Sequence, residues 1–320
     1  MRQVAASARV LSIPMRTKFR GITDREIVLF EGPEGWAEWS PFIEYPDAIA
    51  AHWLQAAFEF AFSTPKLNRD RVGINATLPA VAADDVSEAL SPFGNFRTVK
   101  IKVAEPGQKM ADDLARIRAV HKLYPHARIR LDANGGYSVA NAMQLCYRLA
   151  HAGIELDYFE QPVASIEEMV DLKAKLAGKK IKIAADELVR LAQDPVAVAK
   201  AGAADILVIK AAPLGGISSA LNTVAAAGLP AVISSALESS VGISMGLHLA
   251  GALPGLDYDC GLGTVALLTQ DVCDDPLLPV DGYLPVRRVV PTEARMQALA
   301  ASPERTDWWL KRLDRCLDLI

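Results

Sequence analysis

Histidine and cysteine are scarce in this chain, and neither is grouped. The five histidines form no HExxH pattern, and the four cysteines, Cys146, Cys260, Cys273 and Cys316, form no CxxC pair. The scattered histidines argue against a zinc site. A chain of 320 residues has no need of a disulfide framework. The N-terminal stretch also lacks the clean apolar core of a signal peptide. Together these absences predict a cytoplasmic protein.

A strong excess of charge and a long membrane-like apolar run are missing as well. The formal net charge is −4, without the basic stripe that nucleic-acid binding requires. The longest weakly polar run, SSVGISMGLHLAGALPGL, contains serines, His248 and Pro254, so it predicts a buried helix rather than a membrane span. No obligate protein partner is evident. We therefore expect a globular protein that acts on a small molecule.

The order of apolar segments divides the chain into two parts. Up to residue 93, the strand-like stretches ARVLSIPM and REIVLFEG precede a helical pattern from Pro46 to Phe62. From residue 94 to 284, short apolar strands alternate with helices in units of roughly 25 to 30 residues. Repeated strand–helix units predict an α/β fold with a closed parallel barrel. An open, doubly wound sheet fits the same pattern and stays the alternative.

Acidic residues stand where three successive predicted strands end. The strand in RLDAN ends with Asp132, the strand in YFEQP with Glu160 and the strand in AADE with Asp186, about one repeat apart. A single such residue is usually a helix cap or a turn residue. Three at repeat spacing would meet at one mouth of a barrel, where their repulsion calls for a cation. Because only oxygen ligands are on offer, we predict Mg²⁺, with Mn²⁺ as the substitute.

Lysines interrupt two of the predicted strands. Lys100 and Lys102 lie two apart in TVKIKV, so they face the same side, and Lys210 ends DILVIK. A buried lysine is unfavourable unless it is paired or neutralised. We predict that Lys102 and Lys210 flank the metal from opposite sides and that burial prepares a lysine to act as a base. The alternatives are a snorkelling edge-strand residue for Lys102 and a structural ion pair for Lys100.

A metal between carboxylates and a nearby basic lysine defines a reaction class. The ion would bind a carboxylate substrate, and the lysine would remove the proton from the carbon next to that carboxylate. The resulting enediolate carries extra negative charge on oxygen, which the metal stabilises more strongly than the ground state.

Five short motifs in order resemble one known family. The KIK pair, DAN, EQP, ADE and VIKAAPLGG resemble the muconate-lactonising subgroup of the enolase superfamily over almost the whole chain. This resemblance implies a modified (β/α) barrel at residues 94–284 and an α+β capping domain at residues 1–93, completed by residues 285–320. The lysine and Mg²⁺ chemistry is a recognised solution in that superfamily.

A narrower resemblance implies the reaction. The stretches IPMRTKFRGITDRE, GWAEWSPFIEY, SSALESSVGI and DVCDDPLLPVDGYLPVRR are similar to members that dehydrate a succinyl-hydroxycyclohexadiene carboxylate to an aromatic acid in menaquinone biosynthesis. The resemblance implies that Lys102 takes the α-proton and then helps hydroxide to leave. Lys210 would stay cationic and stabilise the enediolate, and three carboxylates would bind Mg²⁺: Asp132, Glu160 and Asp186.

The resemblance also implies contacts around the reacting atoms. The expected substrate-binding residues are Lys100, Ser234, Ser235, Gly261 and Arg20, with Arg20 on a capping-domain loop that closes over the mouth. Asn134 is expected in the second shell of the metal, unless it only forms a turn. Ser234 and Ser235 could instead cap the following helix, and Arg20 could be a solvated loop charge.

Two other functions fit the same residues. An N-succinyl or N-acyl amino acid racemase would use both lysines to exchange the α-proton, one from each face. A non-catalytic, carboxylate-binding barrel would bind a ligand without turnover.

Overall fold

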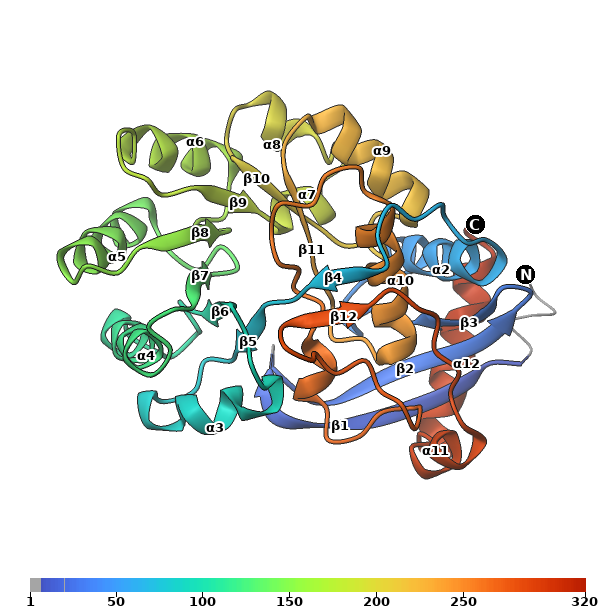
Figure 1. The fold of residues 1–320 in the computed structure, drawn as a ribbon. Helices are drawn as coiled ribbons and strands as arrows, with labels where there is room; N and C mark the ends of the chain where they lie inside the picture. Colours follow the sequence, from blue (N-terminus) through green and yellow to red (C-terminus); the bar gives the residue numbers. More distant parts are fainter. Residues whose placement is uncertain (1–6, 20) are drawn as a thin grey trace.

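Three antiparallel strands open the fold. Strands β1 (Arg9–Phe19), β2 (Ile22–Gly32) and β3 (Gly35–Trp39) form a sheet in the order β1-β2-β3. The computed structural model describes residues 7–19 and 21–320. Helix α2 (Asp47–Phe62) packs on β3, and the C-terminal helix α12 (Pro303–Leu317) packs on α2 and β1. The C-terminal helix therefore lies against the N-terminal part of the fold (Figure 1).

A seven-stranded parallel sheet forms the rest of the core. Its strands follow one another in space in sequence order, without a reversal. Helices follow the strands on the outside of the curled sheet (Figure 1). The strands are β5 (Ala76–Leu78), β6 (Thr98–Lys102), β7 (Arg128–Asp132), β8 (Leu156–Glu160), β9 (Ile183–Ala185), β10 (Ile206–Ile209) and β11 (Ala231–Ile233). The outer helices are α4 (Met110–Leu123), α5 (Val139–His151), α6 (Ile166–Lys175), α7 (Glu187–Arg190), α8 (Ala197–Lys200), α9 (Ile217–Ala227) and α10 (Ser240–Ala252).

One irregular segment joins the two edges of this sheet. Cys260 forms a parallel bridge with Ile74, just before β5, and Gly261 forms one with Ser234, just after β11. The modified barrel with an α+β cap is thus confirmed, and the alternative of an open, doubly wound sheet is wrong. The exact division into residues 1–93 with 285–320 and residues 94–284 stays a prediction.

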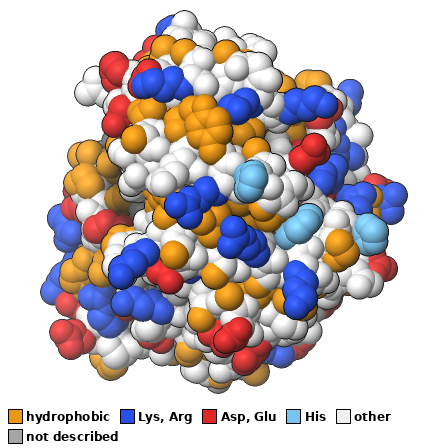
Figure 2. Space-filling model, turned by 90° about the vertical axis from the view of Figure 1, so that its left-hand side faces the viewer, with side chains coloured by type: hydrophobic (Ala, Val, Ile, Leu, Met, Phe, Trp, Pro, Cys, Tyr) orange, Lys and Arg blue, Asp and Glu red, His pale blue; other side chains and the backbone are white. Residues whose placement is uncertain are grey.

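Smaller elements connect these parts. They are η1 (Ala83–Asp85), α3 (Val86–Leu90), η2 (Ser91–Phe93), η3 (Thr264–Leu267), α11 (Glu293–Ala298) and the pair β4 (Arg71–Gly73) with β12 (Tyr283–Pro285). Among the described residues, no helix has the length and apolar character needed to cross a membrane. On the face in Figure 2, basic side chains are interspersed with acidic, hydrophobic and uncharged ones.

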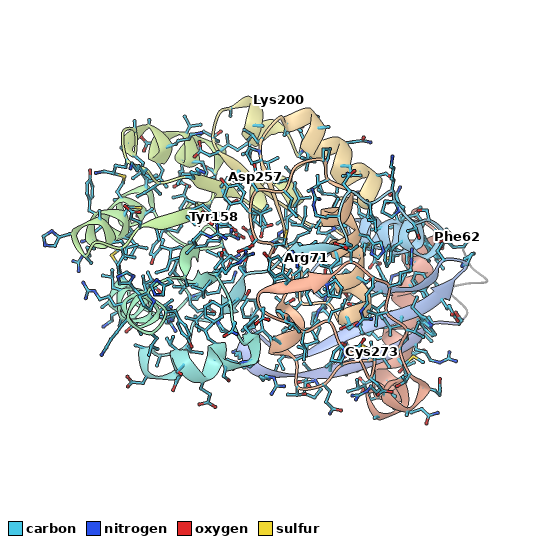
Figure 3. All side chains as sticks on the ribbon, viewed as in Figure 1. Phe62, Arg71, Tyr158, Lys200, Asp257 and Cys273 are labelled. Atoms are coloured by element: carbon cyan, nitrogen blue, oxygen red, sulfur yellow. The ribbon has the colours of Figure 1, made fainter. Side chains whose placement is uncertain are left out.

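A buried arginine fills one end of the barrel. Arg130 on β7 donates from Nε to Asp157 Oδ2 at 2.7 Å and from Nη1 to Asn75 Oδ1 at 3.1 Å. Its guanidinium group lies 4.6 Å from the ring centre of Tyr158, which projects from β8 (Figure 3). Because a buried charge is tolerated only when it is paired and hydrogen-bonded, this cluster holds the strands together at the end opposite to the strand-end carboxylates.

The cap reaches the barrel through a carboxylate at a helix N-terminus. Glu38 on β3 accepts hydrogen bonds at Oε2 from the backbone N–H groups of Ser239 and Gly242, at 3.1 and 3.2 Å. Ser239 is the N-cap of α10 and also donates from its hydroxyl to Glu38 at 2.5 Å. The first N–H groups of a helix lack partners within the helix, so a carboxylate from another element satisfies them.

This contact requires a glycine on α10. A Cβ added to Gly242 would lie 2.5 Å from Glu238 Cβ and 3.0 Å from Glu38 Cδ. We expect Gly242→Ala to lower the free energy of unfolding by about 1–3 kcal/mol, because overpacking outweighs the helix propensity of alanine. Urea unfolding measures the change. Gly255→Ala is the matched control, since nothing lies within 4 Å of a Cβ there. Equal stability of the two variants would contradict this close packing.

Candidate active site

The register of the parallel strands gathers the predicted carboxylates. Lys102 pairs with Asp132 across β6 and β7, and Asp132 pairs with Glu160 across β7 and β8. Glu160 in turn lies opposite Ala184 on β9, two residues before Asp186. The carboxyl ends of parallel strands share one edge, so each repeat contributes one acid to the same mouth.

Two lysines of β6 contact the first two carboxylates. Lys100 Nζ lies 2.9 Å from both carboxylate oxygens of Glu160 and 3.4 Å from Asp132 Oδ2. Lys102 Nζ donates to Asp132 Oδ2 at 2.6 Å and to Asn134 Oδ1 at 2.5 Å. β6 lies between β5 and β7, so Lys102 is not an edge-strand residue. Lys100 does form the ion pair that was the alternative interpretation, although it also borders the pocket described below.

The third carboxylate has a cation on either side. Lys210 Nζ, just beyond β10, donates to Asp186 Oδ2 at 2.5 Å. Arg190 Nε, on α7, lies 3.2 Å from Asp186 Oδ1. Neither Arg190 Nε nor Asp186 Oδ1 has a partner with hydrogen-bond geometry. The acid therefore keeps one buried oxygen without a hydrogen bond.

Burial makes the electrostatics of these groups strong. The side chains of Asp132 and Glu160 are 2% and 0% exposed. Burial opposes the ionised form of Asp132, but the charges of Lys102 and Lys100 hold its pKa well below the usual range. Burial and the charge of Asp132 raise the pKa of Glu160 to about 7. Glu160 stands between two other acids, which leaves its charge the least compensated of the three.

The lysines respond to burial in different ways. Burial opposes the charged form of Lys100, yet the charges of Glu160 and Asp132 raise its pKa well above the ordinary value. Burial lowers the pKa of Lys210 despite the neighbouring Asp186. The two ammonium groups therefore differ in how firmly each holds its proton.

A cavity of about 800 Å³ lies over these groups. The cap contributes Phe19, Phe42 and Trp53 to its wall. The ring centre of Phe19 lies 5.4 Å from Lys102 Nζ. Most of the residues predicted from the sequence border this one cavity: Lys100, Lys102, Asp132, Asn134, Asp186, Lys210, Ser234, Ser235 and Gly261. Among the carboxylates, Glu160 does not border the cavity, but it contacts Lys100, which does. Arg20 lies outside the described residues.

The two predicted serines form part of the barrel wall. Ser234 bridges to Gly261, and a Cβ at Gly261 would lie 2.7 Å from Ser234 Oγ. Ser235 Oγ lies 2.7 Å from Thr264 Oγ1. The alternative in which these serines cap the next helix is wrong, because Ser239 is the N-cap of α10.

The donor set suits a hard divalent cation. The three acids offer only oxygen atoms, and all three are buried, which is the ligand chemistry of Mg²⁺ and Mn²⁺. Asp186 Oδ1 is a buried acceptor without a hydrogen bond. Within the described ranges, no three acid, histidine or cysteine side chains are already arranged as a ligand group, because each acid points to an ammonium group instead. Binding a cation would thus exchange lysine contacts for metal contacts.

Three polar residues of the site escaped the sequence analysis. Gln161, buried and with a positive φ of 36°, accepts the backbone N–H of Asp186 at 3.1 Å. Glu187 and Arg190 form an ion pair at 2.7 Å. The motifs EQP and ADE contain the first two, so their position directly after a metal-ligand candidate was an available signal. Nothing in the sequence marked Arg190.

Comparison with known proteins agrees with this geometry. Residues 81–291 match the family model "Enolase C-terminal domain-like", and residues 10–61 match "Enolase N-terminal domain-like". The muconate lactonizing enzyme from Pseudomonas fluorescens, solved with muconolactone, superposes with a TM-score of 0.78 at 22% identity, over 92% of this chain and 98% of that one. N-succinyl Arg/Lys racemase from Bacillus cereus gives a TM-score of 0.74 at 19% identity, over 92% and 96%. The chain belongs to the enolase superfamily.

More similar relatives narrow this class. The chain is 51% identical over 312 residues to the o-succinylbenzoate synthase of Mycobacterium tuberculosis (strain ATCC 25618 / H37Rv), covering 97% of this chain and 94% of that protein. It is 50% identical to the o-succinylbenzoate synthase of Mycobacterium leprae (strain TN), over 97% and 91%. The chain is thus an enzyme of the o-succinylbenzoate synthase family, a family of lyases.

Proposed function

We propose that the protein catalyses the Mg²⁺-dependent dehydration of 2-succinyl-6-hydroxy-2,4-cyclohexadiene-1-carboxylate to o-succinylbenzoate, a step of menaquinone biosynthesis. The observation that carries this proposal is the buried group of three acids at consecutive strand ends, with Lys102 and Lys210 on different sides of it. The name of the relatives at about half identity supports the choice of substrate.

Lys102 carries out both proton transfers, beside a metal held by the three acids. When bound by Asp132, Glu160 and Asp186, Mg²⁺ supplies positive charge beside the substrate carboxylate and makes the neighbouring C–H bond more acidic. Lys102 Nζ takes this proton, and the electrons of the C–H bond pass to the carboxylate as an enediolate. Lys102 then returns the proton to the departing hydroxide, so water leaves from the same face in a syn elimination and the ring becomes aromatic.

The remaining groups bind and shield the substrate. Lys210 faces the enediolate as a cation and contacts the ring as it becomes aromatic. Lys100, Ser234, Ser235 and Gly261 contact the carboxylate and the succinyl chain of this small-molecule substrate. Phe19, Phe42 and Trp53 of the cap border the cavity and exclude water from it. The proposal includes Mn²⁺ as a substitute for Mg²⁺. It also includes a cytoplasmic location.

The test is a dehydration assay on the purified full chain. With the cyclohexadiene substrate and Mg²⁺ we expect aromatic product to form, to stop after treatment with EDTA, and to resume when Mg²⁺ is returned. The metal is required because it offsets charge that builds up in the transition state. Product formation that is unaffected by complete removal of metal would contradict the metal role. A folded, Mg²⁺-loaded protein without turnover would overturn the substrate assignment.

A racemase of N-succinyl amino acids is the second candidate. Lys102 and Lys210 project from β6 and from the end of β10, which are separated by three strands, so a lysine is available to each face of a bound substrate. Incubation with an N-succinyl amino acid in D₂O decides between them, since a racemase incorporates deuterium at the α-carbon. If the protein binds a carboxylate ligand but catalyses neither reaction, the result would support the third hypothesis, a non-catalytic carboxylate-binding barrel.

A further inference from the structure

A chain of hydrogen bonds leads from Lys102 through Asn134, Glu187 and Arg190 to the cap. Lys102 Nζ donates to Asn134 Oδ1 at 2.5 Å, and Asn134 Nδ2 donates to Glu187 Oε1 at 3.1 Å. The same Glu187 oxygen accepts from Arg190 Nη2 at 2.7 Å. Arg190 Nη1 donates to Tyr45 Oη at 2.7 Å. Tyr45 stands just before α2, so the chain of hydrogen bonds connects the end of β6, the segment after β7 and helix α7 to the cap.

The chemistry of the partners fixes the direction of this chain. An ammonium group only donates hydrogen bonds, and a carboxylate only accepts them. Asn134 can satisfy both neighbours in one orientation, with its oxygen toward Lys102 and its amide N–H toward Glu187. The flipped amide would place a donor against the lysine and an acceptor against the acid. Glu187 therefore determines which atom of Asn134 the lysine meets.

The backbone prepares Asn134 for this contact. Its φ of 45° lies in the left-handed region, which asparagine tolerates better than most residues. Its backbone N–H donates to Asp132 Oδ1 at 3.1 Å. The main chain of Asn134 is thus held from one side and its side-chain amide from the other, so within Asn134 the removal of Glu187 frees the amide and leaves the backbone contact.

An amide acceptor suits a lysine that changes protonation state. Lysine must aim a lone pair at the substrate carbon when it acts as a base, and one N–H held by an acceptor limits the rotation of the amine. Asn134 Oδ1 accepts an N–H from both the charged and the neutral lysine, because the amide itself does not ionise. Proton transfer is sensitive to small errors in orientation, and a misplacement of about 1 Å can lower a rate by about 100-fold.

We propose that Glu187 and Arg190 are positioning residues: they lock the Asn134 amide so that its oxygen orients Lys102 for proton transfer, and Tyr45 ties this lock to the cap. The inference rests on the proposed function only in taking Lys102 as the base. Arg190 is almost fully buried, with a side-chain exposure of 4%, and Glu187 is 21% exposed. Hydrogen bonds between charged groups in such surroundings are short and strong, so the lock is stiff.

The test compares Glu187→Ala with Glu187→Gln. The glutamine oxygen can accept from both Asn134 and Arg190, whereas alanine accepts from neither. We expect Glu187→Ala to lower kcat about 10- to 100-fold while KM changes less than about 3-fold. Glu187→Gln should retain at least about a third of the wild-type kcat. A larger primary deuterium isotope effect with α-deuterated substrate is expected for the alanine variant, because proton abstraction becomes slower than the other steps.

A double-mutant cycle separates the lock from general damage to the site. Asn134→Ala and Glu187→Ala act on the same lysine contact, so their double variant should be no slower than the slower single variant. Multiplied effects, an equal loss for the alanine and glutamine variants, or a rise in KM with unchanged kcat would each overturn the proposal. Tyr45→Phe removes one hydroxyl and is the variant to use if the alanine variants do not fold. We expect Tyr45→Phe to lower kcat about 3-fold or more. An unchanged kcat would refute the role of Tyr45 in connecting Arg190 to the cap.

A structural measurement tests the lock without any reaction. In a crystal structure of metal-free Glu187→Ala, we expect the Asn134 amide to have left hydrogen-bond distance of Lys102 Nζ, whereas Glu187→Gln should keep it there. An Asn134 that stays in place in the alanine variant would overturn the positioning role even if the enzyme acts on another substrate. Lack of dehydration by the wild-type protein, in contrast, would refute only the proposed substrate.

Discussion

Lys102→Met is expected to lower the rate of dehydration by about 1000-fold or more and to leave the protein folded. General acid–base groups typically contribute about 100- to 10,000-fold, and this lysine is proposed to act twice, first as base and then as acid. Methionine keeps an unbranched apolar side chain but has no amine to accept a proton. Single-turnover assays measure the loss, and thermal unfolding checks the fold.

The electrostatics explain why the fold should tolerate this change. Removing Lys102 takes one of two cations from Asp132, but Lys100 stays within 3.4 Å of that acid. Titration calorimetry with Mg²⁺ should therefore still detect binding in the variant. Lys182→Met is the matched control. Lys182 stands just before β9, is exposed, and donates to the hydroxyl of Tyr258. A Lys102→Met variant that keeps more than a tenth of the wild-type rate would remove Lys102 from the chemistry.

The sequence predicted the arrangement of carboxylates and lysines because the position of each residue at the end of its strand can be recognised from the local sequence. Asp132 and Glu160 are the last residues of their strands and Asp186 directly follows β9. Parallel neighbours align their carboxyl ends, so spacing along the chain translates into proximity in space. Asp132 and Glu160 are indeed direct partners across β7 and β8. The same reasoning located the helix up to Phe62, which α2 confirms.

Features that depend on distant segments left no such signal. Strand β5 spans only Ala76–Leu78, which is too short for an alternating pattern to be recognised. The segment at Cys260 and Gly261 closes the barrel through isolated bridges and forms no regular strand. Arg190 gains its role only where Tyr45 of the cap meets α7. Contacts of this kind appear when the two parts of the chain are docked, and neither part predicts them alone.

Glu38 belongs to the same class of long-range contact, and it gives the protein a pH dependence that can be measured. Burial, together with the charge of the neighbouring Glu238, raises the pKa of Glu38 from 4.5 to about 7. Burial also raises the pKa of Glu238. Arg25 of β2, which donates to the backbone oxygens of Ala236 and Leu237 at 3.2 and 3.1 Å, acts in the opposite direction on both acids.

The sign of the effect follows from the folded and unfolded proton affinities. A folded-state pKa above the unfolded value means that the folded protein holds this proton more tightly. The contribution is fully present below about pH 4.5 and is lost as the pH rises through about 7. Each tenfold difference in proton affinity is worth about 1.4 kcal/mol, so the whole loss is about 3 kcal/mol. Ionisation is unfavourable because the buried charge loses its hydration and repels Glu238, although the hydrogen bond from Ser239 at the N-terminus of α10 favours the charged form.

Glu38→Gln should remove this loss. The glutamine oxygen can accept from Ser239 and Gly242 as the carboxylate does, and its amide can donate to the hydroxyl oxygen of Ser40. We expect urea unfolding to give similar stabilities for the variant and the wild type at pH 5, and a variant that is more stable by about 3 kcal/mol at pH 8.5. At equal Mg²⁺ concentration, the groups that the two proteins share contribute equally to both free energies of unfolding, so their contribution cancels in the difference.

Two further variants test whether the buried pair is the cause. Glu238→Gln removes the neighbouring negative charge, so the wild-type loss of stability should shrink if the pair of Glu38 and Glu238 causes it, and should stay unchanged if another group is responsible. Glu88→Gln, on the exposed surface of α3, should follow the wild type at every pH. Parallel pH profiles for Glu38→Gln and the wild type would contradict the raised pKa. Because Ala236 and Leu237 of the adjoining loop border the cavity, a confirmed effect would also connect the pH stability of the cap contact to the wall of the active site.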